Sequence, residues 1–168
     1  MESIKCRECG KDLSSKAVVC PHCGIMYPGN PAWKGWGIDK KSEGIIGGLP
    51  LYHISFGIDE KGKIRRAEGF FAIGQFARGY FVLAQFGIAY IFGIGQGIIS
   101  PVSIAQLALG LLSVGQIAIG IVSVGQFAAG IYSLCQMGFA LNLLSMTHKD
   151  QSAVEFFRPF IHFIKNIF

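Results

Sequence analysis

A glutamine returns about every ten residues through the apolar middle of this chain. The seven are Gln75, Gln85, Gln96, Gln106, Gln116, Gln126 and Gln136. Most of the sequence that they mark, from Gly79 to Thr147, contains no Asp, Glu, Lys, Arg or His. A ten-residue period is not a helix period, because a helix turns every 3.6 residues. The stretch therefore calls for a fold other than the membrane helices that its hydropathy suggests.

A stricter five-residue repeat underlies the glutamines. Throughout residues 110–134 each five opens on Gly, carries an apolar residue third and has Ser or Ala fourth, as in Gly110-Leu-Leu-Ser-Val and Gly115-Gln-Ile-Ala-Ile. The phase slips by one residue near 89–95 and is regular again before that point. Self-similarity at a fixed period is the signature of a repeat protein.

The five-residue period favours strands over helices. Positions five apart on a helix are displaced by about 140°, so the glycines would spiral around all sides of it. Close helix packing in lipid prefers small residues four apart. An extended chain with a corner every five residues fits better, because the small first residue can turn the corner. We therefore predict a mainly β fold built from five-residue sides.

This pattern resembles the pentapeptide-repeat β-solenoid. The resemblance implies square coils of four fives, in which the third residue of each five faces inward. These inward residues are predicted to be Leu107, Leu112, Ile117, Val122, Phe127 and Tyr132. Four fives per coil give about three coils and a stack about 15 Å tall. The glutamines would then form structural ladders on two opposite faces, with amides twenty residues apart hydrogen-bonded up each ladder.

The outward positions of the repeat are mostly Ile, Leu, Val, Ala and Ser, whereas pentapeptide repeats carry polar residues there. An apolar surface of this size marks contact with membrane or protein. A stack about 15 Å tall does not cross a hydrocarbon layer of about 30 Å by itself. We therefore expect it to lie in or on one leaflet, or to pair with copies of itself.

The alternative fold is a zinc ribbon followed by about three transmembrane helices. An uncharged stretch of 69 residues is long enough for three spans of about 20 residues. Against it, the stretch contains eleven glycines and lacks the charged loops that would fix a helical topology. The sequence favours the solenoid and leaves the helical alternative open.

Four of the five cysteines form two Cys-x-x-Cys pairs, Cys6 with Cys9 and Cys20 with Cys23. A Gly follows each pair and suits a turn with positive φ. Two such knuckles close a four-thiolate site with Zn–S bonds of about 2.3 Å. The chain starts without an apolar signal segment, so we expect a cytoplasmic N-terminus, where paired cysteines bind metal rather than form disulfides. One structural Zn²⁺ per chain is predicted.

Residues 4–27 resemble the short bacterial zinc ribbon found at the N-termini of many otherwise unrelated proteins. This resemblance implies Cys6, Cys9, Cys20 and Cys23 as the zinc ligands and His22 as a surface residue. The whole chain resembles, more loosely, bacterial proteins that join such a ribbon to a Gly-rich apolar repeat. That wider resemblance implies no activity. Cys135 lies at a repeat position otherwise filled by Gly or Ala and is expected to be a small packed residue.

The rest of the chain is predicted to form a linker, a cap and a terminal helix. Residues 51–58 and 64–68 are expected to pair as a β-hairpin that caps the repeat. The final segment reads as an amphipathic helix, which would lie in a membrane interface or cap the last coil. The predicted segments are a zinc ribbon at 1–27, a linker at 28–43, a hairpin cap at 44–69, the repeat at 70–147 and the helix at 148–168.

Charge and motifs argue against an enzyme and against a nucleic-acid surface. His53, His148 and His162 form no motif with a nucleophile or a carboxylate pair. The net charge of +5 is spread thinly, without a dense Lys/Arg run. The sequence indicates a non-enzymatic zinc-binding repeat protein, membrane-associated or self-assembling, in a structural role that extends to perturbing a membrane. The alternative is a helical membrane protein with a cytoplasmic zinc-ribbon head, a small transport or signalling subunit.

The expected partners follow from the same features. Membrane lipid, copies of the chain, or both would cover the repeat. Zinc ribbons bind proteins or nucleic acids or stabilise a chain end, and the sequence leaves a protein partner at the ribbon open.

Overall fold

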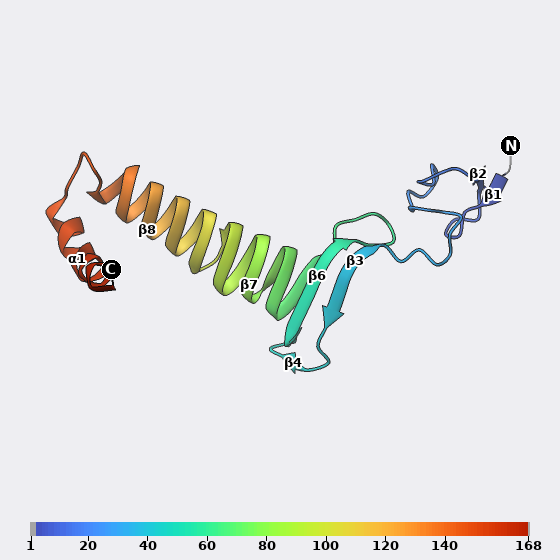
Figure 1. Cartoon of the computed structure of the whole chain (residues 1–168), viewed down its shortest axis with the longest axis horizontal. Helices are drawn as coiled ribbons and strands as arrows, with labels where there is room; N and C mark the ends of the chain where they lie inside the picture. Colours follow the sequence, from blue (N-terminus) through green and yellow to red (C-terminus); the bar gives the residue numbers. More distant parts are fainter. Residues whose placement is uncertain (1–2, 168) are drawn as a thin grey trace.

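Residues 66–144 wind into a narrow β-solenoid, the long rod in Figure 1. The computed structural model describes residues 3–167. Strands β7 (Arg66–Ile99) and β8 (Val102–Leu144) each coil on themselves. Phe92 pairs in parallel with Val102 and Ile99 with Leu109, an offset of ten residues. At ten residues per coil and about 4.8 Å between strands, about eight coils make a rod about 38 Å long.

The mainly β solenoid predicted from the sequence is confirmed, and the alternative of about three transmembrane helices is wrong, because the same residues form strands. The square coil is also wrong. Each coil has two five-residue sides rather than four, so the rod has about eight coils instead of three. In the described part of the chain, helix α1 (Gln151–Ile167) falls short of what a helical membrane crossing requires.

The interior of the rod is filled by the fourth residue of each five. These residues are small and fully buried: Ser103, Ala108, Ser113, Ala118, Ser123, Ala128 and Ser133. The predicted inward residues lie outside instead. Leu107, Leu112, Ile117 and Phe127 are 39% to 45% exposed, and Val122 and Tyr132 are half-buried. Two sheets separated by only Ser and Ala leave no room for a Leu or Phe between them.

Buried serines make hydrogen bonds between neighbouring coils. Ser103 Oγ donates to Ser113 Oγ at 3.1 Å, and the hydroxyls of Ser123 and Ser133 lie 2.7 Å apart. Ser113 Oγ also donates to the carbonyl oxygen of Ile119 across the interior at 2.9 Å. Buried hydroxyls are costly unless bonded, so these contacts make a polar interior tolerable.

Glycine opens most fives because the preceding coil passes close by. A Cβ added at Gly120 would collide with the carbonyl oxygen of Gly110. A Cβ added at Gly95 would meet the carbonyl oxygen of Ala84, eleven residues earlier. The slip of phase predicted near 89–95 thus corresponds to one coil with an extra residue.

Two coils replace the small interior pair by one large residue facing a glycine. Val82 is buried opposite Gly87, and a Cβ added at Gly87 would lie 2.6 Å from Val82 Cγ1. Ile98 is buried opposite Gly93, and a Cβ there would lie 2.6 Å from Ile98 Cγ2. The interior of each coil therefore holds a nearly constant side-chain volume.

The N-terminal end of the rod is closed by two strands. Strand β6 (Tyr52–Ile58) pairs in parallel with β7 and antiparallel with β3 (Trp36–Lys41). The predicted hairpin is observed only next to its turn, where Ile58 bridges antiparallel to Ile64 and the Arg65 N–H donates to the Gly57 carbonyl at 2.9 Å. Most of β6 instead pairs in parallel with β7. Part of the predicted linker instead forms β3, which covers the open edge of β6. Strands β4 (Ile45–Ile46) and β5 (Leu49–Pro50) form a small separate pair between them.

A buried histidine joins these strands to the first coil. His53 is 3% exposed; its Nε2 lies 2.7 Å from Asp39 Oδ1, and its Nδ1 accepts the Glu68 N–H at 2.7 Å. Arg65 Nη1 donates to the other carboxylate oxygen of Asp39 at 3.1 Å. The hydrogen bond from His53, together with the charge of Arg65, holds the pKa of the Asp39 carboxyl below its usual range.

We expect Asp39→Asn to remove part of the acid sensitivity of this end of the rod. Because the folded-state pKa of Asp39 is depressed, its contribution to stability is present above about pH 4 and is lost as pH falls through the folded value. Unfolding midpoints from pH 2 to 7 should therefore fall less steeply in the variant. Glu43→Gln removes an exposed carboxyl from the same region and serves as the control. Parallel pH profiles for Asp39→Asn and wild type would contradict the assignment.

Helix α1 packs against the last coils of the rod. Ala153 and Phe157 are buried, and the Phe156 ring stacks on Tyr132 with centroids 4.4 Å apart. Asp150 Oδ2 accepts the Leu143 N–H at 2.7 Å just before the helix begins. Of the two roles left open by the sequence, contact with the end of the rod is therefore observed, while an interfacial role stays a prediction.

Candidate metal centre

The two cysteine knuckles at the N-terminus have the same backbone structure. The Gly10 N–H donates to the Cys6 carbonyl at 2.9 Å, and the Gly24 N–H donates to the Cys20 carbonyl at 2.9 Å. Both glycines have positive φ, +70° and +76°, which a side chain would strain. The Cys-x-x-Cys-Gly pattern thus forms the same tight turn twice.

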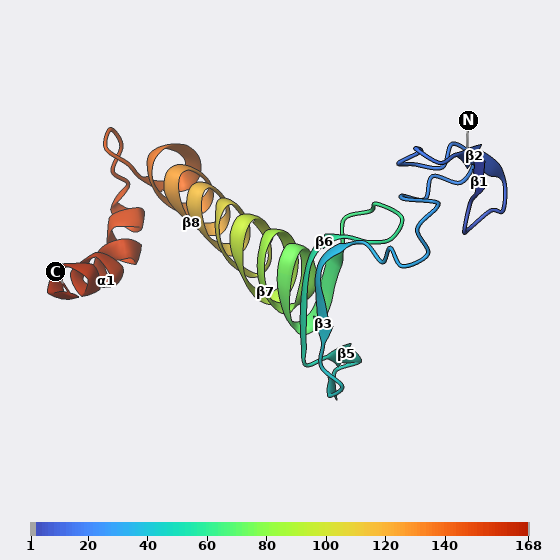
Figure 2. The same cartoon turned by 45° about the vertical axis from the view of Figure 1, so that its right-hand side comes forward.

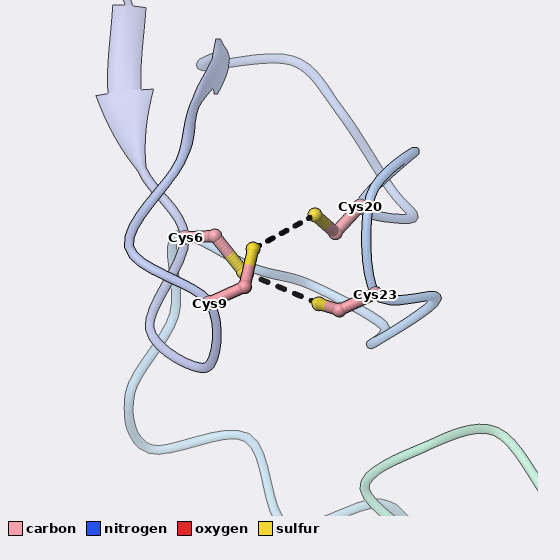
Figure 3. Close-up of side chains that lie close together, drawn as sticks. All are labelled: Cys6, Cys9, Cys20 and Cys23. Carbon is pink, nitrogen blue, oxygen red and sulfur yellow. Dashed lines mark hydrogen bonds between the residues drawn. The ribbon is translucent and has the colours of Figure 1, made fainter.

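The knuckles face each other with all four sulfur atoms in one cluster (Figure 3). Cys6 Sγ lies 3.6 Å from Cys23 Sγ, and Cys9 Sγ lies 3.8 Å from Cys20 Sγ. All four sulfurs are within 4.8 Å of one another. Tetrahedral zinc with bonds of about 2.3 Å needs sulfurs about 3.8 Å apart. The cluster fits a zinc-ribbon-like metal site, and the distances are too long for disulfides.

The thiols influence one another strongly. The pKa of Cys6 falls to about 6, first because the backbone N–H of Cys9 hydrogen-bonds to its sulfur. The backbone N–H of Ile25 acts in the same direction on Cys23, yet desolvation and the other three sulfurs raise the pKa of Cys23 to about 12. Negative charge thus collects readily on one sulfur and resists spreading to a second. A divalent cation at the centre would remove that resistance.

The cluster suits a structural ion rather than a catalytic one. Four thiolates complete a tetrahedron and leave no position for water or substrate. Two of the four cysteines, Cys6 and Cys20, are buried against Leu13 and Ile25, so the sulfur cluster and the small core share residues. His22 is exposed, as predicted. Strands β1 (Ser3–Lys5) and β2 (Asp12–Ser14) pair beside the first knuckle.

The ribbon is attached to the segment that follows it. Arg7 Nη1 donates to the Trp33 carbonyl at 2.8 Å, and the rings of Tyr27 and Trp33 lie 4.4 Å apart. Trp33 therefore packs on the ribbon. Trp36 is exposed in β3.

The glutamines lie along one edge of the rod rather than on two opposite faces. The coil offset of ten places each above the next, and four of them, Gln106, Gln116, Gln126 and Gln136, line an open groove of about 740 Å³. The small residues Gly115, Gly125 and Cys135 form its floor. Cys135 is buried, as expected of a small packed residue. The hydrogen bonds between interior side chains of neighbouring coils join serines, and a glutamine ladder stays a prediction.

The structure also assigns partners that sequence reasoning missed. His53 meets Asp39 from a strand fourteen residues earlier, a spacing that belongs to no motif. His148 lies 3.1 Å from Asp150 at the other end of the rod, where the hydrogen bond from the Leu143 N–H, and then the contact with His148, lower the pKa of Asp150. The interior serines did have a signal, because they recur every ten residues from 103 to 133.

Comparison of the chain with protein-family models, with curated proteins and with solved structures finds no match. The functional assignment therefore rests on the cysteine cluster and on the surface of the rod.

Proposed function

We propose that this chain is a non-enzymatic structural protein in which a zinc-stabilised ribbon is carried by an apolar rod held in a membrane. The observation that carries this proposal is the outer surface of the solenoid from Gly79 to Leu144, which is apolar and uncharged on both flat sides. Such a surface is far larger than monomeric soluble proteins usually expose.

The apolar surface is built by repetition. Each coil presents large side chains on both sides of the rod, for example Leu111 and Leu112 on one and Ile117 and Ile119 on the other, all more than 40% exposed. They cannot turn inward, because the interior holds only small residues. Acyl chains would cover both sides at once without requiring a specific partner.

The distribution of charge supports a cytoplasmic position for the ribbon. Eight of the fifteen Lys and Arg residues fall between Lys34 and Arg78, next to the start of the uncharged coils. Basic residues flanking an apolar membrane segment favour the cytoplasmic side. The ribbon would then stand at the membrane surface, where a protein partner could reach it.

Self-assembly is the second candidate function. The observation that favours it is the groove of glutamines and small residues along one edge of the rod, which a second copy could enter. This candidate predicts large soluble assemblies when no lipid is present.

We expect the purified chain to float with lipid vesicles in a density gradient and to resist extraction with carbonate. The double variant Ile121→Glu/Ile131→Glu places two carboxylates in successive coils of one outer column and should leave the floating fraction, because charge in hydrocarbon is costly. Ile45→Glu, at an exposed residue outside the rod, should float like wild type. Sedimentation of the wild type away from vesicles, as protein alone, would overturn the membrane assignment in favour of self-assembly.

A further inference from the structure

We infer that the solenoid crosses the bilayer along its own axis, with the zinc ribbon on one side and helix α1 on the other. The inference rests on the proposed membrane function and goes beyond it, since membrane binding alone would also be met by a rod lying within one leaflet. In this arrangement the acyl chains of both leaflets contact the apolar surface of the rod.

The length of the uncharged part matches a bilayer. From Gly79 to Leu144 the rod has between six and seven coils without a charged side chain. At about 4.8 Å per coil this part is about 30 Å long, the thickness of the hydrocarbon layer. The stack of about 15 Å expected from square coils could not have reached across. Halving the number of residues per coil is what makes crossing possible.

The backbone of the rod meets the main condition for crossing. A segment in hydrocarbon must satisfy its N–H and C=O groups within the protein. Each coil pairs with the coil before and the coil after it, so the hydrogen bonds run along the axis and the sides of the rod present side chains only. Open strand edges arise only at the two ends. At the N-terminal end β6 and β3 continue the sheet, and at the other end Leu144 bridges to Lys149.

Charge changes along the axis of the rod rather than around it. Arg66, Glu68 and Arg78 lie in the first coils, beside β6, and the charges resume at the far end with Lys149 and Asp150. Figures 1 and 2 show the ribbon and α1 at opposite ends of the rod. A rod that lies in an interface instead carries a strongly charged long face. The long polar feature of this rod is the uncharged glutamine edge.

Tyrosines occupy both ends of the uncharged part, as they do at membrane interfaces. Tyr80 and Tyr90 lie in its first two coils, and Arg78 Nε donates to the Tyr90 hydroxyl at 2.7 Å. Tyr132 lies near the other end, stacked on Phe156 of α1. The four coils between Tyr90 and Tyr132 contain no tyrosine. The glutamines of those coils are about 4.8 Å apart, which lets neighbouring amides bond to one another along the edge.

The positions of the lysines allow a test of whether the two ends of the rod lie on opposite sides of the membrane. The chain has no lysine between Lys63 and Lys149, and both are exposed. The experiment treats sealed vesicles containing the full chain with a protease that cuts after lysine. Molecules with the ribbon outside should yield the fragment 64–168, and those with the ribbon inside should yield a fragment ending at 149. No molecule should be cut at both lysines until detergent opens the vesicles, whatever the mixture of orientations.

The fragment 64–149 in intact vesicles would overturn the inference and leave the membrane function standing, since both ends would then lie on one side. Failure of the chain to float with vesicles would overturn both. Detergent-treated vesicles must give the fragment 64–149, which shows that both lysines can be reached. Its appearance only after detergent supports crossing.

A matched pair of variants tests how deep two positions of the rod lie in the bilayer. Leu111 and Leu141 stand in the same outer column, three coils apart, and both are exposed. In a crossing rod Leu111 is near the bilayer centre and Leu141 near its surface, so Leu111→Arg should reduce the inserted fraction at least ten-fold more than Leu141→Arg. Equal losses indicate a rod lying in one leaflet.

Polarised infrared spectra of oriented bilayers give an independent answer, because the amide C=O groups of a crossing rod lie along the membrane normal.

Discussion

Cys20→Ser should release the metal and unfold the ribbon while the solenoid persists. Cys20 is buried in the ribbon core, and the four sulfurs are the site's only predicted ligands. Structural zinc contributes apparent binding free energies of about 10–16 kcal/mol, most of which stabilises the fold around it. We expect zinc content to fall from about one per chain to near zero, with loss of the ordered amide signals of residues 3–27.

Cys135→Ser is the matched control, because Cys135 is the one cysteine outside the cluster. It should keep one zinc per chain, and so should His22→Ala. The β-type circular dichroism of the rod should survive Cys20→Ser, since β7 and β8 share no core with the ribbon. One zinc per chain in Cys20→Ser would disprove the four-thiolate assignment.

Gly93→Ala should destabilise the rod by about 1–3 kcal/mol, because the new methyl group would press on Ile98 Cγ2 at 2.6 Å. Ile98→Ala should cost about 2–5 kcal/mol by leaving a cavity. The double variant should recover much of both losses, since its coil would contain two small residues, like the coil of Ser103 and Ala108. Denaturant unfolding of the four proteins measures the coupling between the two sites.

Gly93→Ala combined with Ala118→Gly is the control pair, because residues 93 and 118 lie more than two coils apart. Their effects should add. If the losses in Gly93→Ala/Ile98→Ala also simply add, the two side chains do not share one interior space, and the account of constant volume per coil is wrong.

The ribbon could be predicted almost completely from sequence, whereas the coil of the solenoid could not. Knuckle geometry is local: Cys6, Cys9 and Gly10 determine one turn, and the same spacing repeats at Cys20. The number of sides in a coil depends on which side chains fit between the sheets. Assigning the third residue of each five to the interior demanded a wide coil, and the buried Ser and Ala at the fourth position require a narrow one.

The sequence nevertheless contains a signal for a ten-residue coil. Residues that stack on one another in parallel coils meet the same environment, so like residues recur at the coil length. Ser113 and Ser123 alternate with Ala118 and Ala128, and glutamine occupies every second five. Both patterns repeat at ten rather than twenty. Strand β3 gave no such signal, because its polar sequence becomes a strand only by pairing with β6.

The ten-residue coil also determines how far the rod extends for each residue of sequence. Ten residues advance this rod by about 4.8 Å, whereas ten residues of α-helix advance about 15 Å. Duplicating or deleting one ten-residue unit would therefore change its reach in fine, equal steps while preserving its cross-section. A single inserted residue enlarges one coil without adding another, as in the eleven-residue coil between Ala84 and Gly95. The length of the rod can therefore be adjusted one coil at a time, which suits a protein whose length must match the thickness of a bilayer.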